Sequence, residues 1–350
     1  MGWLISLLVL SALIFFHELG HYAAARLTGV YVEVFSIGFG KKLFSFRWFN
    51  TEWRIAAIPL GGYVKMKGQD DLDPSGTSPD SDSYNSKTPL QRIFILLAGP
   101  AANFILAFVL YILIGIGGPQ VLSPVVGEVV KESPAEAAGL KKDDRIITAN
   151  GVKVGTWYDM SEIIKNTSGP VALTVERDNF LYNITVSPRI TETTNMFNET
   201  VKRRMVGISS AGVTHRLDLD LFESIAYASD ETYKASMMIF TSLQKLITGD
   251  VPAKELGGVV SIVKITADAS ESGWMAVLFF AALISVNLGV LNLLPIPALD
   301  GGHIMFNLYE LITRHAPSET VLVRLTIAGW GILLGLMSLG IYNDINRLMQ

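Results

Sequence analysis

The stretch MGWLISLLVLSALIFFHELGH, residues 1–21, decides what kind of protein this chain forms. No charged residue lies between Trp3 and Phe16, and the run then ends in the ionisable side chains His17, Glu18 and His21. Positions i and i+4 share one face of an α-helix, so the two imidazoles can converge on one metal ion. Ionisable groups at membrane depth are costly and usually functional. The stretch therefore predicts a membrane-spanning helix that carries part of a metal site.

Zinc is the metal that this pattern favours, because two neutral imidazoles and one carboxylate, with a fourth position left open, form a common catalytic zinc site. Glu18 lies beside the two histidines and is the candidate general base, which would take a proton from a water molecule that zinc makes more acidic. Two alternatives remain. One is a chance match to HExxH, and the other is a helix whose polar side chains only pair with their neighbours.

The composition indicates an integral membrane protein. Of the residues, 50% are hydrophobic and 17% are charged, and the mean hydropathy is +0.38. Four stretches approach the roughly 20 apolar residues that cross a bilayer, namely 3–25, 93–116, 274–294 and 321–341. The first lacks the basic start and the cleavage site of a signal peptide. The predicted fold class is therefore membrane α-helical, with a core of four transmembrane helices.

Charge sets the predicted orientation. Between the first two spans the chain carries many basic residues, which favour the cytoplasmic side. They are Arg26, Lys41, Lys42, Arg47, Arg54, Lys65, Lys67, Lys87 and Arg92. Both termini and the long segment 117–273 are then expected outside. The net charge of −4 gives no reason to expect nucleic acid, and the absence of cysteine excludes disulfides and thiolate ligands.

The third metal ligand should come from the chain after the third span, which runs parallel to the first and ends at the same depth. Pro295 and Pro297 cannot continue a helix there, so the chain unwinds just before Asp300. Asp300 is the predicted carboxylate ligand. It could instead cap the following helix, and the two roles can coexist. His303 is the nearest rival ligand and could also be a partner of the site, whereas His215 and His315 are expected to be ordinary polar residues.

With HELGH at 17–21 and NLLPIPALDGGH at 292–303, the chain resembles the site-2 protease family, the RseP-type bacterial regulated intramembrane zinc metalloproteases of peptidase family M50B. Further resemblance lies in GFG at 38–40, EWRIAAIPLGGYVKM at 52–66, GPAAN at 99–103 and NDI at 343–345. The resemblance implies a zinc metalloendopeptidase in which His17, His21 and Asp300 bind zinc and Glu18 is the catalytic base. It also implies that Asn292, with Pro295 and Pro297, helps to hold the substrate.

A transmembrane helix must be unwound before it can be cut, and its freed backbone groups must then find partners. Residues 51–66 read as β-hairpin pieces on the cytoplasmic side, and an edge there could add the substrate as another strand. Ile55 and Ile58 are the candidate contacts. The alternative is an ordinary hairpin packed on the surface. The zinc ion and Asn292 together would stabilise the oxyanion, unless Asn292 only caps the broken helix.

Residues 125–187 contain alternating apolar strands around SPAEAAGL at 133–140, and this pattern resembles a single PDZ domain. The expected organisation is spans one and two with the hairpin region in 1–116, the PDZ domain in 117–190, an amphipathic helical linker at the outer membrane surface in 191–273, and spans three and four in 274–350. The PDZ domain could act as a size filter or as a peptide receptor.

The resemblance implies an enzyme of the bacterial inner membrane with its active site near the cytoplasmic face. Its substrates would be single-span membrane proteins, such as an anti-sigma factor or remnant signal peptides, cut after another protease has trimmed them. The competing hypothesis is a catalytically idle PDZ scaffold in the membrane with structural zinc. Glu18 distinguishes the two, because a scaffold does not need a general base beside an open metal site.

Overall fold

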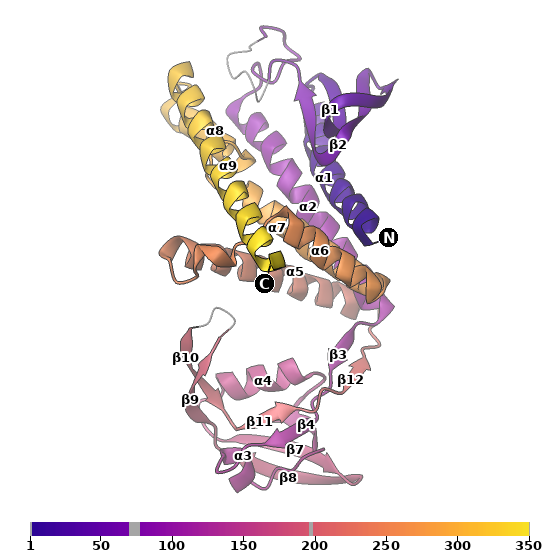
Figure 1. Cartoon of the computed structure of the whole chain (residues 1–350), viewed down its shortest axis with the longest axis vertical. Helices are drawn as coiled ribbons and strands as arrows, with labels where there is room; N and C mark the ends of the chain where they lie inside the picture. The colour runs from indigo at the N-terminus through magenta and orange to yellow at the C-terminus, as the bar shows by residue number, and fades with distance from the viewer. Residues whose placement is uncertain (1, 70–77, 196–198, 350) are drawn as a thin grey trace. The chain divides into compact units, whose positions relative to one another are not determined.

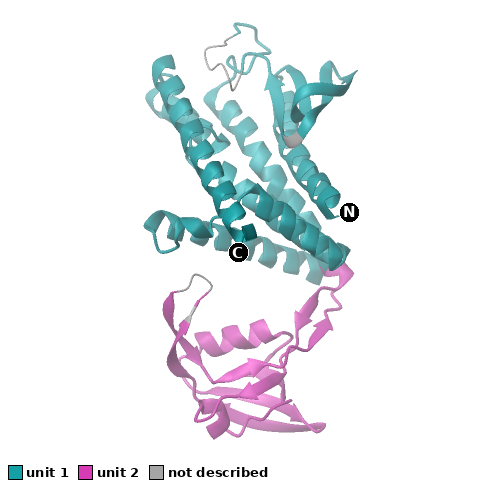
Figure 2. Cartoon of the chain, viewed as in Figure 1, with its two compact units in different colours: residues 1–114, 221–350 teal, residues 115–220 magenta. Residues whose placement is uncertain are grey.

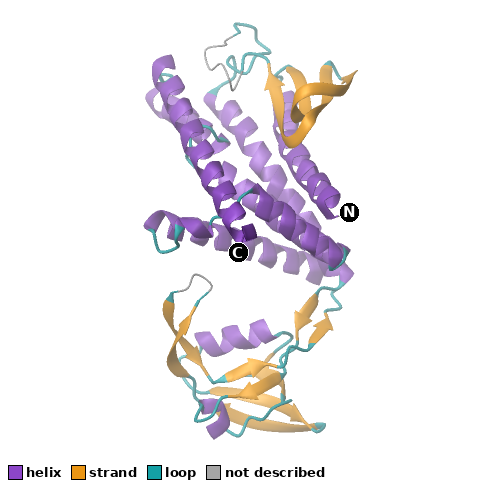
Figure 3. Ribbon diagram, in the orientation of Figure 1, coloured by secondary structure: helices purple, strands orange, loops and turns teal. Residues whose placement is uncertain are grey.

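The computed structural model describes residues 2–69, 78–195 and 199–349 of the chain. It divides into two compact units, residues 1–114 with 221–350 and residues 115–220 (Figure 2). Helices dominate the first, which we call the helical unit, although it also contains a sheet. Strands dominate the second, which we call the β-rich unit (Figure 3).

The main elements of the helical unit are α-helices (Figure 1). They are α1 (Gly2–Leu27), α2 (Pro89–Gly117), α5 (Leu221–Thr248), α6 (Val259–Glu271), α7 (Trp274–Asn292), α8 (Asp300–Thr313) and α9 (Glu319–Met349), with a 3₁₀ turn at Ala253–Glu255. In the described part of the chain, α1, α2, α7 and α9 are long and apolar enough to cross a membrane. A helix suits this setting because it pairs its own backbone groups where no water is present. The four predicted spans are confirmed as helices.

The start of α6 is held by a carboxylate from another helix. Asp344 of α9 accepts hydrogen bonds from the backbone N–H groups of Gly258 and Ser261, both at 3.0 Å, and from the hydroxyl of Ser261. These are the groups that a helix start leaves without an internal partner. The helix α6 in turn packs against α1, where the Ser6 hydroxyl donates to the carbonyl of Val263 at 2.9 Å.

A folded-back sheet lies against α1 (Figure 1). Its strands β1 (Val32–Trp48) and β2 (Thr51–Met66) are joined through Phe49 and Asn50, whose φ angles of 47° and 60° suit a tight hairpin turn. Residues 34–37 pair with 52–55 on one side and with 62–65 on the other. Among the described pairings, residues 62–66 are bonded on one side only. They therefore form an open edge of this sheet.

Aromatic packing joins the sheet to the helix end that carries the histidines. The Trp53 ring stacks on Phe35 with centroids 4.4 Å apart, and Tyr22 of α1 meets Trp53 edge-on at 5.1 Å. Farther along the sheet, a Cβ atom at Gly62 would lie 3.2 Å from Cγ of Glu18. The open edge thus passes directly beside the HELGH sequence.

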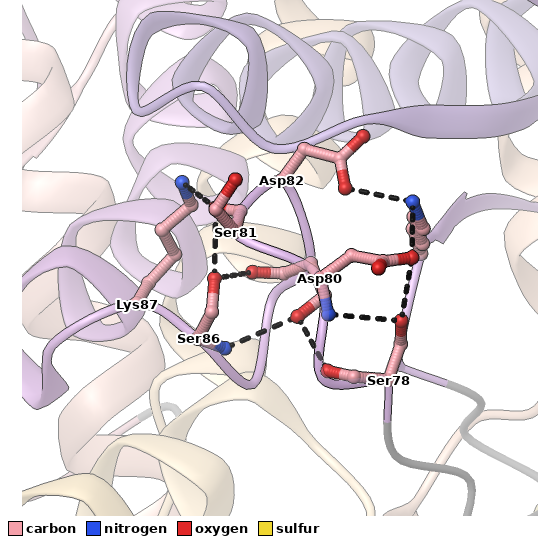
Figure 4. Close-up of polar contacts among 8 residues, drawn as sticks. Ser78, Asp80, Ser81, Asp82, Ser86 and Lys87 are labelled. Carbon is pink, nitrogen blue, oxygen red and sulfur yellow. Dashed lines mark hydrogen bonds and ion pairs between the residues drawn. The ribbon is translucent and has the colours of Figure 1, made fainter.

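The connection from β2 to α2 is ordered by ion pairs and serine hydrogen bonds (Figure 4). Nζ of Lys67 lies 2.7 Å from a carboxylate oxygen of both Asp80 and Asp82. These two hydrogen bonds hold the pKa of Lys67 above its ordinary value. Lys87 Nζ and the Ser86 hydroxyl each donate to the carbonyl of Ser81 at 2.9 Å. This network connects the end of β2 to the residues that precede α2.

The β-rich unit is built of short strands around one apolar core. Its elements are β3 (Gln120–Leu122), β4 (Val126–Val129), α3 (Pro134–Ala137), β5 (Arg145–Ala149), β6 (Val152–Lys153), α4 (Trp157–Asn166), β7 (Val171–Arg177), β8 (Phe180–Val186), β9 (Arg189–Thr194), β10 (Thr200–Met205), β11 (Ile208–Ser210) and β12 (Thr214–Arg216). The largest sheet has the order β6-β5-β7-β8. Buried Asp144, directly before β5, accepts a hydrogen bond of 2.6 Å from Nε of Arg177 at the end of β7.

The end of this unit differs from the expected boundary at residue 190. The unit continues to residue 220, because β11 pairs with β4 and β12 pairs with β3. Residues 191–216 were expected in a helical linker, whereas their described part forms strands. The helical part of the expected linker 191–273 begins with α5. The partners of these short strands lie about 80 to 95 residues earlier in the chain, so there is little local pattern to predict from.

Candidate metal centre

The two histidines of α1 face each other across one turn of helix. Their ring centroids are 4.8 Å apart, and Nε2 of His17 lies 3.2 Å from Nε2 of His21. The i, i+4 spacing brings the rings together, as the sequence predicts. His21 is buried and His17 is partly buried.

Asp300, the first residue of α8, completes the cluster. Its Oδ2 atom lies 3.4 Å from Nε2 of both His17 and His21, and the three candidate ligand atoms fall within 4.8 Å of one another. Tetrahedral ligand atoms at zinc distances of 2.0–2.1 Å would be separated by about 3.3–3.4 Å. The donor set of two imidazoles and a carboxylate therefore fits a zinc ion in both chemistry and spacing.

The turn before α8 positions Asp300. A Cβ atom at Gly301 would lie 2.3 Å from the carbonyl oxygen of Leu294, and one at Gly302 would lie 2.3 Å from that of Ile296. Only glycine permits this close packing of the turn on the helix start. The capping alternative finds no support, because α8 begins at Asp300 itself and no side-chain cap bonds its start.

Glu18 and the three candidate ligands line one cavity of about 580 Å³. Its wall includes residues 62–66 of the open sheet edge, the end of the turn before α8, and side chains of α2, α8 and α9. Sequence reasoning missed Phe39, Leu96, Thr326 and Trp330, which also line it. A polar residue within a span, such as Thr326, is the one sequence signal that could have indicated a member of this wall.

The predicted substrate-binding residues divide into two groups. Asn292 lines the cavity, and its Nδ2 atom lies 3.3 Å from Nε2 of His17. Pro295 and Pro297 lie in the turn between α7 and α8, but neither is in the described cavity wall. Ile55 and Ile58 are also outside that wall, and their side chains are 48% and 51% exposed.

The sheet register explains why Ile55 is not at the cavity. Its backbone pairs with Ile37 on one side and with Phe44 on the other. Ile55 is therefore in a strand segment with neighbours on both sides, and not at an edge of the sheet. Ile58 is opposite Phe39 at the bend of the sheet. The edge that reaches the cavity is residues 62–66, which include Tyr63.

The remaining histidines lie outside the cluster of ligand atoms. His303 lines the cavity one turn after Asp300 but is not part of the three-residue cluster. His215 is in the β-rich unit and is bonded to Ser123 at 2.8 Å. His315 is exposed and lies 2.8 Å from the carbonyl of Thr313.

Contacts from α2 reach the far side of both imidazoles. Nδ1 of His21 lies 2.8 Å from the carbonyl oxygen of Ile95, and Nδ1 of His17 lies 3.2 Å from Nδ2 of Asn103. Histidines that bind metals usually bond a partner through the other ring nitrogen. In the sequence, Asn103 ends the GPAAN motif and is an amide within an apolar span, but neither feature indicates a contact with His17.

Known proteins similar to this chain carry names that indicate zinc-dependent proteolysis. The sequence pattern described as "Peptidase family M50" matches residues 5–336. A Campylobacter jejuni protein named "Putative zinc metalloprotease Cj1068" is 45% identical over 347 residues, covering 99% of this chain and 94% of that protein. A Helicobacter pylori protein named "Putative zinc metalloprotease" is 38% identical, covering 99% and 100% of the two chains. "Metalloprotease MmpA" of Caulobacter vibrioides is 35% identical, covering 98% and 95%.

These matches span nearly the whole chain, and the zinc-compatible cluster of His17, His21 and Asp300 lies within the matched residues. The four membrane-spanning candidates suit a multi-pass membrane enzyme. The chain therefore belongs to peptidase family M50 and is a zinc-dependent metalloprotease of the membrane.

Proposed function

We propose that this metalloprotease cuts single-span membrane proteins within the bilayer, with His17, His21 and Asp300 as zinc ligands and Glu18 as general base. The observation that carries the proposal is the set of three ligand atoms within 4.8 Å of one another, in one cavity with Glu18. Because the two histidines and Glu18 stand on a helix able to cross a membrane, the reaction would take place at membrane depth.

Each side chain then has a defined task. When bound, zinc makes a water molecule more acidic and polarises the scissile carbonyl. Glu18 takes the proton from the attacking water and later delivers it to the leaving amine. Nδ2 of Asn292, 3.3 Å from Nε2 of His17, is close enough to the site to donate to the developing oxyanion.

The substrate would enter as an extended strand beside residues 62–66. This segment is the open edge of the β1–β2 sheet, and it lines the cavity. Strand addition would satisfy the backbone groups that unwinding sets free. We therefore assign the main substrate contact to this edge instead of to Ile55 or Ile58. Pro295 and Pro297 would act indirectly, by stiffening the turn that precedes Asp300.

The proposed substrates are remnants of single-span proteins, either an anti-sigma factor or signal peptides, after a first trimming cleavage. This choice rests on the resemblance of the sequence motifs to site-2 proteases. In the same scheme the enzyme lies in a bacterial inner membrane, with the active site near the cytoplasmic face. The β-rich unit would be a PDZ domain on the outer side, where it bars substrates that keep a large outer domain.

A reconstituted cleavage assay with measured zinc content tests the proposal. Glu18→Gln should abolish cleavage while zinc remains bound, and Asp300→Ala should lose both zinc and cleavage. Glu271→Gln is a matched control, because it removes an exposed carboxyl outside the cavity, and it should behave as wild type. Cleavage that survives in Glu18→Gln would refute the mechanism, and full zinc content in Asp300→Ala would refute the ligand assignment.

A further inference from the structure

We propose that Asn103 is a positioning residue, which accepts a hydrogen bond from Nδ1–H of His17 and so directs Nε2 of that ring at the metal. The inference rests on the proposed assignment of His17 as a zinc ligand. It adds a third helix to the metal centre, because Asn103 belongs to α2 whereas the ligands come from α1 and α8.

The ring nitrogen that faces the cluster determines where the proton of His17 must be. Nε2 of His17 is the atom near His21 and Asp300, at 3.2 Å and 3.4 Å. A nitrogen that binds a metal must offer a lone pair, so the neutral ring carries its proton on Nδ1. That N–H needs an acceptor, because it is inside the protein.

His21 already has such an acceptor beside its Nδ1 atom. Its Nδ1 lies 2.8 Å from the carbonyl oxygen of Ile95, an atom that can only accept. This contact places the proton of His21 on Nδ1 and leaves Nε2 free for a metal. The equivalent position at His17 is occupied by the side-chain amide of Asn103, at 3.2 Å from Nδ1.

The Asn103 amide can supply the same kind of acceptor. As oriented, its Nδ2 faces the ring, while its buried Oδ1 has no hydrogen-bond partner among the described residues. A half-turn about the Cβ–Cγ bond exchanges the two atoms, which differ little in size. Oδ1 then faces Nδ1–H of His17. Binding of a metal at Nε2 requires this orientation, because two N–H groups would otherwise point at each other.

The surroundings hold Asn103 in place for this role. The residue is fully buried, and its backbone carbonyl accepts a hydrogen bond of 2.8 Å from the Ser285 hydroxyl of α7. Small residues bring α2 this close to α1, since a Cβ atom at Gly20 would lie 2.1 Å from the carbonyl oxygen of Ala98. The backbone of Asn103 is therefore held in place. The rotation of its amide group about the Cβ–Cγ bond determines whether Nδ2 or Oδ1 faces His17.

Zinc affinity of two Asn103 variants tests the inference. Asn103→Leu keeps the shape but removes the acceptor, and we expect about 10- to 100-fold weaker zinc binding in chelator competition. It should also alter the visible spectrum of the cobalt-substituted protein. Asn103→Asp restores an acceptor and should bind zinc about tenfold more tightly than the leucine variant. Wild-type affinity in Asn103→Leu, or equal weakness in Asn103→Asp, would overturn the inference.

Two controls separate this role from simple packing. Asn307→Leu removes another buried amide, whose Nδ2 bonds the carbonyl of His303 at 2.8 Å, and it should leave zinc affinity unchanged. His17→Ala tests the ligand itself. If His17→Ala loses zinc and Asn103→Leu does not, only the present inference fails. If His17→Ala keeps its zinc, the ligand assignment fails first.

A measurement on wild-type protein covers the case in which a variant does not fold. In nitrogen-15 NMR, the metal-free protein should show a coupling between Nδ2 of Asn103 and Nδ1 of His17 across an N–H···N hydrogen bond. Zinc should abolish this coupling and leave a proton on Nδ1 of His17. Persistence of the coupling in the zinc-loaded protein would contradict the predicted rotation of the amide.

Discussion

The carbonyl oxygen of Ile95 lies 2.8 Å from Nδ1 of His21, so the backbone of α2 determines which nitrogen of a HELGH histidine faces the metal centre. This contact requires α1 and α2 to approach closely. Gly99 permits it, because a Cβ atom there would lie 2.2 Å from Nε2 of His21. The second span therefore contacts the candidate metal centre, although it supplies none of the three clustered ligand atoms.

Gly99→Ala should therefore damage metal binding. The added methyl group would occupy the position of the His21 ring, and overpacking of this kind typically costs about 1–3 kcal/mol. We expect at least about tenfold weaker zinc binding, by analogy with the loss of a residue that orients a ligand. Zinc titration of the purified variant measures the effect.

Gly335→Ala provides the matched control on α9, because a Cβ atom at that position has open space around it. Alanine favours a helix by about 1 kcal/mol over glycine, so this variant should be at least as stable as wild type. It should also bind zinc normally. Equal zinc affinity in the Gly99 and Gly335 variants would contradict the packing argument.

Much of the candidate metal centre was predictable from local spacing and topology. The i, i+4 pair His17 and His21 follows from helix geometry, and Asp300 follows from the parallel direction of two spans. The contact between Asn103 and His17 was not predictable, because it depends on how closely two helices approach. An edge within residues 51–66 was expected, but its position at residues 62–66 instead of at Ile55 and Ile58 was not predictable for a similar reason, since the folding back of both strands is a tertiary feature.

Acid should loosen one end of the β1–β2 sheet. Glu52 accepts from Lys42 at 2.8 Å and from Arg54 at 2.9 Å, and these hydrogen bonds lower the pKa of Glu52 to about 2. The pKa of Glu52 in the folded sheet is therefore lower than its ordinary value of 4.5. The ion pairs of Glu52 stabilise the sheet fully at pH values above 4.5. Their contribution is lost as the pH falls through about 2.

The loss should reach the cavity wall, because Arg54 also donates to the Tyr63 hydroxyl at 3.0 Å. Hydrogen exchange of residues 51–66 should speed up between pH 4.5 and pH 2, beyond the intrinsic pH dependence of the amides. Glu52→Gln should lack this acid-dependent step. Glu128→Gln, in the β-rich unit, should retain it. A wild-type profile in Glu52→Gln would show that other groups control the transition.

Removal of the β-rich unit should relax substrate selection if the unit is a size filter. Gln120 of β3 and Arg216 of β12 are paired, so a short Gly-Ser linker can replace the residues between them. The shortened enzyme should cleave a substrate that keeps its folded outer domain, while wild type should cleave only the trimmed form. Cleavage of the trimmed substrate by both enzymes is the internal control. Unchanged discrimination would rule out the filter.

The bond between Asp344 and the start of α6 should be a local stability determinant of the helical unit. In the wild-type protein the backbone N–H groups of Gly258 and Ser261 both donate to the Asp344 carboxylate at 3.0 Å. In Asp344→Asn, the side-chain NH₂ group would face one of these two N–H groups. Leaving such a donor unpaired costs about 1–3 kcal/mol, so the variant should unfold at lower denaturant and exchange amides 258–262 faster. Asp268→Asn removes an exposed carboxyl of the same helix and should change neither measurement. If both variants behave alike, the hydrogen bonds of Asp344 add no stability, because the two substitutions remove the same charge but only one removes these bonds.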